Sequence, residues 1–193
     1  LEHTGGTRDK RPPIPGCKIN VSLGGFRRVL KSCGCGLNGQ TDEIAPADKK
    51  LYALRDVTAT VESPNLICAS IMSKKLAEGM DGLVLDVKTG SGAFMKTEKD
   101  SVHLAELMVE TGERMGKKMV ALIPDMDQPL GLQVGTALEV AECIQVMTGG
   151  GPADLREVWV EPAAGMFYPA ARPPVFCACR RWADSPLREH PPP

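Results

Sequence analysis

Two short runs of branched apolar residues enclose a segment with helical periodicity, and this order most constrains the fold. Residues 82–87 read GLVLDV, residues 119–123 read MVALI, and residues 98–115 between them are amphipathic at helical spacing. A strand, a helix and a second strand in this order form a crossover between parallel strands. Continuous apolar runs are typical of strands that are buried on both faces. The sequence therefore predicts an α/β fold with a mainly parallel sheet flanked by helices.

Three further segments are predicted to be helices: residues 46–55, 63–78 and 136–147. Ser63 can cap the second of these helices, because Pro64 then occupies the first helical position. Gly79 can end the same helix in a left-handed conformation. Ligands of open α/β sheets bind beyond the carboxyl ends of the strands. The loop of residues 88–94, which follows the first predicted strand, is therefore a candidate wall of a binding site.

The end of the chain differs in composition from the rest. Residues 157–193 contain eight of the 16 prolines and both tryptophans, without a period of 2 or 3.6. Proline removes a backbone donor and breaks helices and strands. We therefore predict a domain over residues 1–157 and, over residues 158–193, a Pro-rich tail that is unrelated to it and lacks regular structure. The alternative is a segment that binds a partner as a polyproline II helix.

Charge and cysteine content exclude several classes of protein. The chain has 23 basic and 24 acidic residues, so a polycationic nucleic-acid-binding arm is not expected. Its apolar runs are far shorter than the roughly 18 residues of a membrane-spanning helix. Seven cysteines at irregular spacing, without an export signal, indicate reduced thiols in the cytoplasm. The start at Leu1 indicates a fragment of a longer protein.

One predicted helix face mixes apolar and polar residues. Four residues share this face at i, i+3, i+4 and i+7: Ile67, Ser70, Ile71 and Lys74. Burial of an unpaired ammonium group is costly, so either the face lies at a solvated rim, or Ser70 and Lys74 point together into a polar pocket. Arg55, one helix earlier, has a planar guanidinium that suits paired acceptors. A salt bridge from Arg55 to Asp56 or Glu62 is the alternative.

A glycine turn lies near the start of the chain. Residues 3–7 read HTGGT, so exposed backbone N–H groups lie beside the hydroxyls of Thr4 and Thr7. Such a turn can hold an anion, although Gly-Gly turns are common and the motif alone is not specific. The sequence shows no nucleophile–base–acid triad and no convincing pair of catalytic carboxylates.

Three segments together resemble the family of thymidine phosphorylase and the similar pyrimidine nucleoside phosphorylases: residues 3–10, 46–95 and 125–152. The resemblance covers residues 1–157. It implies that the chain is part of a large α/β domain, without the small helical domain that family members also have. It further implies homodimers that cleave thymidine or deoxyuridine with phosphate, giving the free base and 2-deoxyribose 1-phosphate. Phosphate is a co-substrate, and no cofactor is expected.

The resemblance also implies roles for individual residues. Arg55, Ser70 and Lys74 match the residues that hydrogen-bond the 2,4-dioxo edge of the pyrimidine, and Arg55 and Lys74 are the candidate catalytic residues. Fixed cations and donors stabilise a base that leaves as an anion. Residues matching the wall of the base pocket are Tyr52, Phe94 and Leu1, and the residue matching a phosphate ligand is Thr7. In this interpretation Ser70 and Lys74 are pocket residues rather than rim residues.

Other parts of the family site have no counterpart in the sequence. The remaining phosphate ligands of the family lie upstream, in a Gly-rich loop and at a serine before the HTGGT turn. We therefore predict that the isolated chain has little activity and that its full-length parent is active. A cation site of the family uses carbonyls near Leu130 and a glutamate matching Glu142, but its other ligands lie upstream, and no metal is predicted. The alternatives are a phosphorylase of broader substrate range and a non-catalytic product, because vertebrate members resemble an endothelial growth factor linked to angiogenesis.

Overall fold

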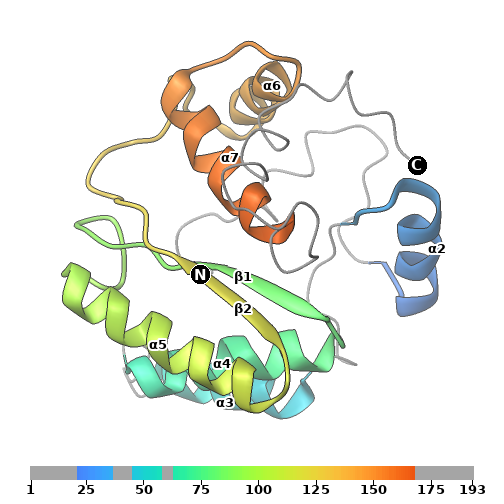
Figure 1. Ribbon diagram of the computed structural model, residues 1–193, viewed down its shortest axis with the longest axis vertical. Helices are drawn as coiled ribbons and strands as arrows, with labels where there is room; N and C mark the ends of the chain where they lie inside the picture. Colours follow the sequence, from blue (N-terminus) through green and yellow to red (C-terminus); the bar gives the residue numbers. More distant parts are fainter. Residues whose placement is uncertain (1–20, 37–44, 58–62, 168–193) are drawn as a thin grey trace. The chain divides into compact units, whose positions relative to one another are not determined.

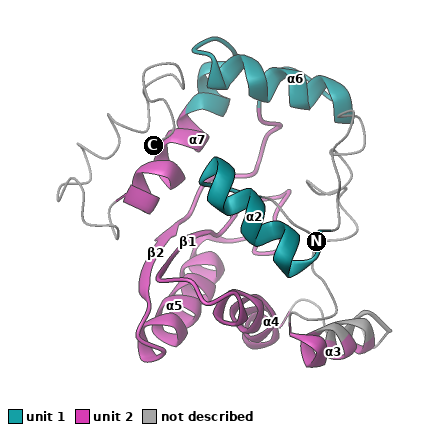
Figure 2. Cartoon of the chain, turned by 90° about the vertical axis from the view of Figure 1, so that its right-hand side faces the viewer, with its two compact units in different colours: residues 1–41, 131–156, 185–193 teal, residues 42–130, 157–184 magenta. Residues whose placement is uncertain are grey.

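The computed structural model describes residues 21–36, 45–57 and 63–167, without the side chains of residues 49, 52, 53 and 55–57 (Figure 1). The elements are α2 (Leu23–Cys33), α3 (Pro46–Val57), α4 (Pro64–Ala77), β1 (Gly82–Asp86), α5 (Glu98–Arg114), β2 (Lys118–Leu122), α6 (Thr136–Met147) and α7 (Ala153–Phe167). The chain divides into two compact units (Figure 2). Unit 1 comprises residues 1–41, 131–156 and 185–193, and unit 2 comprises residues 42–130 and 157–184.

The sheet of unit 2 is a parallel pair of strands. The register runs from Gly82 opposite Lys118 to Asp86 opposite Leu122. Helix α5 connects the two strands and lies with α4 on one face of the pair (Figure 1). The predicted α/β fold class with a parallel sheet flanked by helices is therefore confirmed. None of the helices in the described ranges is both long and apolar enough to cross a membrane.

The core of unit 2 lies between the sheet and helices α4 and α5. Met72 of α4 and Met108 of α5 are almost fully buried against alternate residues of β1, including Leu85. On the opposite face, Val84 lies close to Gly165 of α7, where a Cβ atom would come within 3.1 Å of a Val84 methyl group. Helices therefore contact both faces of β1, as its continuous apolar run predicts.

The ends of the helices follow from local capping chemistry. Pro64 begins α4 as predicted, and Gly79 follows it with φ of +74°, but the Ser63 side chain makes no capping hydrogen bond. Ser63 therefore occupies the predicted N-cap position, but its side chain does not cap the helix. Thr97 caps α5, because its hydroxyl accepts from the Asp100 N–H at 3.2 Å and donates to the Asp100 carboxylate at 2.7 Å.

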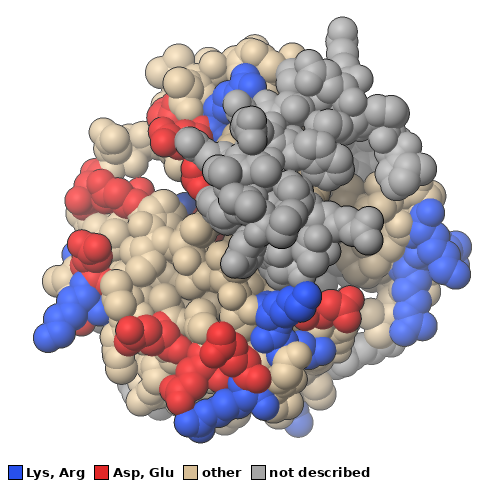
Figure 3. All heavy atoms as spheres, in the orientation of Figure 1, with Lys and Arg blue, Asp and Glu red and all other residues tan. Residues whose placement is uncertain are grey.

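Helix α2 of unit 1 was not predicted from the sequence. Ser22 caps it by accepting the Gly25 N–H at 3.3 Å, and Gly34 ends it with φ of +73°. The helix carries Arg27, Arg28 and Lys31 and no acidic residue. Figure 3 shows a group of basic side chains at its position, whereas acidic and basic side chains are mixed on the lower part of the face drawn.

The prediction that regular structure ends at residue 157 is wrong. Helix α7 continues to Phe167 and contains Pro162 inside it. An internal proline costs about 3 kcal/mol in a helix. Val160 and Ala164 are buried one turn apart, so burial of this apolar face offsets the missing hydrogen bond. Residues 168–193, the rest of the predicted tail, lie outside the described residues.

Candidate functional site

The loops that follow β1 and β2 are joined at the carboxyl ends of the strands. Residues 88–95, here called the glycine loop, follow β1. The Thr89 N–H donates to the Pro124 carbonyl at 3.1 Å, and the Met126 N–H donates to the Thr89 carbonyl at 2.7 Å. The Gly92 N–H donates in turn to the Met126 carbonyl at 3.0 Å. The loop predicted to wall a site is therefore fixed to the loop of the neighbouring strand.

Two charged side chains hold the glycine loop in shape. Asp127 accepts the Ser91 N–H at 2.6 Å, and the Lys96 ammonium donates to the carbonyls of Ser91 and Ala93 at 2.9 and 2.7 Å. Gly90 has φ of +110°, and a Cβ atom there would lie 2.6 Å from an Asp127 oxygen. Only glycine fits both the conformation and the space. The hydrogen bond from the Ser91 N–H lowers the pKa of Asp127 below its ordinary value of 3.8.

This hydrogen bond gives an expected pH dependence. A carboxyl whose pKa is lower in the folded than in the unfolded state stabilises the fold above the unfolded value, and the effect is lost as the pH falls through the folded value. We expect the amide signal of Ser91 to titrate below pH 3.8 in an NMR titration, and this transition to be absent in Asp127→Asn. A Ser91 transition centred above pH 3.8, or one that persists in Asp127→Asn, would contradict the assignment.

Ser70 and Lys74 lie one turn apart on α4, and their side chains meet. The Lys74 Nζ donates to the Ser70 Oγ at 2.8 Å and to the Asp48 Oδ2 of α3 at 2.7 Å. The side chains of Lys74 and Asp48 are 25% and 10% exposed, and Ser70 is buried. The ammonium group is therefore ion-paired between two helices, which explains how a charged residue is accommodated on a largely apolar helix face.

The other predicted base-site residues are only partly described. Tyr52 and Arg55 lie on α3, but their side chains lie outside the described part of the structure. With Asp48 they occupy positions i, i+4 and i+7, which lie on one side of a helix. Leu1 and Thr7 lie outside the described residues altogether. The roles of these four residues remain predictions.

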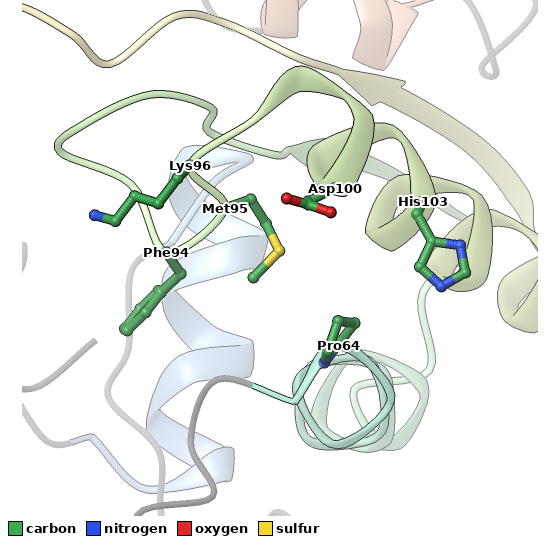
Figure 4. Close-up of a pocket in the computed structure, with 6 residues that line it drawn as sticks. All are labelled: Pro64, Phe94, Met95, Lys96, Asp100 and His103. Atoms are coloured by element: carbon green, nitrogen blue, oxygen red, sulfur yellow. The ribbon is translucent and has the colours of Figure 1, made fainter.

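Phe94 lies at the end of the glycine loop and packs in part against the core of unit 2. It also lines a shallow cleft of about 210 Å³ with Pro64, Met95, Lys96, Asp100 and His103 (Figure 4). Phe94 and Lys96 lie at one end of the cleft, and His103 lies at the other. Asp100 and His103 were not predicted as site residues from the sequence, although their i, i+3 spacing places them on one side of α5.

Asp48 is a polar partner of Lys74 that was not predicted from the sequence. It lies 26 positions before Lys74 in the chain, and only the packing of α3 on α4 brings the two together. A carboxylate in the first turn of a helix is usually explained by its favourable interaction with the helix dipole. The position of Asp48 in the sequence therefore did not indicate an ion pair with Lys74.

A buried carboxylate lies in unit 1. Glu142 of α6 is 4% exposed and accepts the N–H groups of Leu132 and Gln133 at 2.9 and 3.4 Å. Asp154 accepts the Gly131 N–H of the same loop at 3.0 Å, and this hydrogen bond lowers the Asp154 pKa. Both carboxylates therefore fix the loop before α6. Over the ranges that the structure describes, no three His, Cys, Asp or Glu residues are grouped to hold a metal ion.

Comparison with known proteins gives consistent results. Residues 1–173 match the model of the glycosyl transferase family, a/b domain. The chain is 46% identical to the pyrimidine-nucleoside phosphorylase of Geobacillus stearothermophilus over 189 residues, which are 98% of this chain and 44% of that protein. It is 52% identical to the Bacillus subtilis protein of the same name over 158 residues, which are 82% of this chain and 36% of that protein.

Two features of these matches bear on the extent of the domain. The chain spans less than half the length of the curated relatives that it matches. The family match continues to residue 173, beyond residue 157, where the sequence analysis ended the resemblance. Like helix α7, this match places part of the predicted tail with the domain.

Proposed function

Because the chain belongs to the thymidine and pyrimidine nucleoside phosphorylase family, we propose that it carries the base-binding part of an enzyme that transfers a pentosyl group from a pyrimidine nucleoside to phosphate. In this reaction the bond between the sugar C1′ and the base nitrogen breaks, and a bond between C1′ and a phosphate oxygen forms. The observation that carries the proposal is the Lys74 ammonium, held 2.8 Å from the Ser70 hydroxyl.

The chemistry of the leaving group supports these roles. The electron pair of the broken bond stays on the pyrimidine, so the base departs with negative charge. A preorganised cation and hydroxyl beside the ring stabilise this charge in the transition state. An ammonium group only donates, so the Ser70 Oγ is the acceptor in its bond with Lys74, and the Ser70 hydroxyl keeps its own hydrogen to donate to a further acceptor. A carbonyl oxygen of the pyrimidine fits that place, and Arg55 adds a second cation in our proposal.

The names of the relatives support pyrimidine nucleosides as the substrate class. Within that class we propose thymidine and deoxyuridine as substrates, with phosphate as the second substrate and no cofactor. Three residues form the wall of the base pocket in this proposal: Tyr52, Phe94 and Leu1. Thr7 binds phosphate, and the intact protein acts as a homodimer in the cytoplasm. A phosphorylase that also accepts uridine is the alternative, and the broad name of the relatives favours it.

A hybrid enzyme tests the proposed function. The segment of the Bacillus subtilis pyrimidine-nucleoside phosphorylase that matches this chain would be replaced by the chain's own residues, which are 52% identical to it. We expect the hybrid to release thymine from thymidine only when phosphate is present, and the same hybrid with Lys74→Met to be much slower. Comparison of thymidine, deoxyuridine and uridine decides the substrate range. A folded hybrid without phosphate-dependent release would contradict the proposal.

A further inference from the structure

Asp48 has no role in the proposed reaction, yet it contacts a residue at the centre of it. Asp48 lies on α3, the helix that precedes α4, and its Oδ2 is 2.7 Å from the Lys74 Nζ. We propose that Asp48 is a positioning residue of the base site, which holds the Lys74 ammonium against Ser70 and thereby sets the direction of the Ser70 hydroxyl. This inference rests on the proposed function of Ser70 and Lys74.

The need for a positioning group follows from the lysine side chain. Lysine has a flexible four-carbon stem with several rotatable bonds, so one hydrogen bond within the same helix holds its ammonium loosely. Asp48 and Ser70 bind the Lys74 ammonium from different helices, at 2.7 and 2.8 Å. Charge-assisted hydrogen bonds are roughly twice as strong as neutral ones. Two such contacts from two elements therefore restrict the ammonium to a small volume.

Partial burial strengthens the attraction between the Asp48 carboxylate and the Lys74 ammonium. The Asp48 side chain is 10% exposed, so water and salt screen its interaction with Lys74 less than they screen a surface pair. The carboxylate also places a negative charge beside the Lys74 ammonium when no base is bound. Asparagine at position 48 keeps the shape and an acceptor oxygen but removes this charge. Asp48→Asn therefore separates the effect of the charge from the effect of packing.

The first experiment needs no ligand and uses the 193-residue chain. We expect the ammonium ¹H–¹⁵N signal of Lys74 to be observable by NMR, because two hydrogen bonds slow its exchange with water. The signal should be strongly broadened in Asp48→Asn, which keeps an acceptor oxygen but loses the charge, and should persist in Asp81→Asn, which removes a charge from an exposed bend. Asp48→Glu should keep part of the signal, because it keeps the carboxylate, and Asp48→Ala replaces Asp48→Asn if that variant does not fold. A signal unchanged in the Asp48 variant, or absent in the unmodified chain, would overturn the inference.

The second experiment measures thymine binding by the same variants. We expect Asp48→Asn to weaken binding roughly 10- to 100-fold, the effect of losing one charge-assisted hydrogen bond. In a Lys74→Met background Asp48→Asn should have no further effect, because Asp48 acts through Lys74. Equal weakening in both backgrounds would overturn the positioning role. If the unmodified chain does not bind thymine while the Lys74 signal behaves as expected, that result would contradict the proposed function. It would still support the interaction by which Asp48 positions Lys74.

Discussion

Replacement of Lys74 by methionine is expected to lower the free energy of unfolding of this chain by about 2–4 kcal/mol, slightly less than for a fully buried ion pair. The variant leaves the Asp48 carboxylate, only 10% exposed, without its ammonium partner. Because Lys74 itself keeps 25% of its side chain exposed, water can reach part of the site and reduces the cost. Urea unfolding followed by far-ultraviolet circular dichroism measures the change.

A neighbouring lysine supplies the matched control. Lys75 pairs with Glu78 at 3.1 Å, and both side chains are about 40% exposed. Exposed pairs of this kind contribute little, so Lys75→Met should change stability by less than about 1 kcal/mol. The double variant Asp48→Asn with Lys74→Met should regain most of the lost stability, because it removes the unpaired charge. Equal stability of Lys74→Met and Lys75→Met would show that the ion pair between α3 and α4 is not formed.

The isolated 193-residue chain is expected to release thymine from thymidine many orders of magnitude more slowly than an intact relative. Phosphate must be held in line with the sugar C1′ as the glycosidic bond opens. By resemblance, Thr7 is one phosphate ligand, and the family's other phosphate ligands have no matching residues within residues 1–193. Each missing charge-assisted hydrogen bond is worth roughly 1.5–3 kcal/mol, so the loss of three corresponds to about 10³- to 10⁶-fold in rate.

The measurement is thymine release with and without phosphate, beside the Bacillus subtilis pyrimidine-nucleoside phosphorylase as a reference for an intact relative. Phosphate-dependent turnover by the isolated chain within about tenfold of the reference rate would show that the phosphate site does not depend on the upstream ligands.

The central part of the fold could be predicted because its signals are local. The apolar runs of β1 and β2 and the periodic segment between them define the parallel pair. Helix α6 begins and ends at the predicted residues, Thr136 and Met147. For each of these helices and strands, the spacing of the hydrophobic residues and the positions of the glycines agree with the observed packing. The elements could therefore be predicted without knowledge of contacts between distant residues.

The errors arose where local rules compete with packing. In α7 the proline content predicted an irregular chain, but burial of Val160 and Ala164 keeps the helix intact through Pro162. In α2 the capping serine and the terminal glycine were present, yet a glycine pair at its start weakened the helical pattern. Composition alone therefore underestimated the regular structure at both ends of the described chain.

In the candidate site too, features with a local sequence signal could be predicted, and features that depend on packing between helices could not. The i, i+4 spacing places Ser70 and Lys74 on the same face of one helix, and their side chains meet there, but the spacing alone did not distinguish a polar pocket from a solvated rim. The Asp48 partner depends on how α3 packs against α4, which no spacing within one helix reveals. Sequence also singled out the glycine loop, but not the Asp127 and Lys96 contacts that fix its shape.

NMR mapping with thymine tests directly whether a pyrimidine base binds at Ser70 and Lys74, as we propose. We expect thymine added to the 193-residue chain to shift the signals of Ser70, Lys74 and Phe94, and these shifts to be lost in Lys74→Met but kept in Lys75→Met. Thymine-induced shifts confined to other residues, or shifts that are unchanged in Lys74→Met, would contradict the claim.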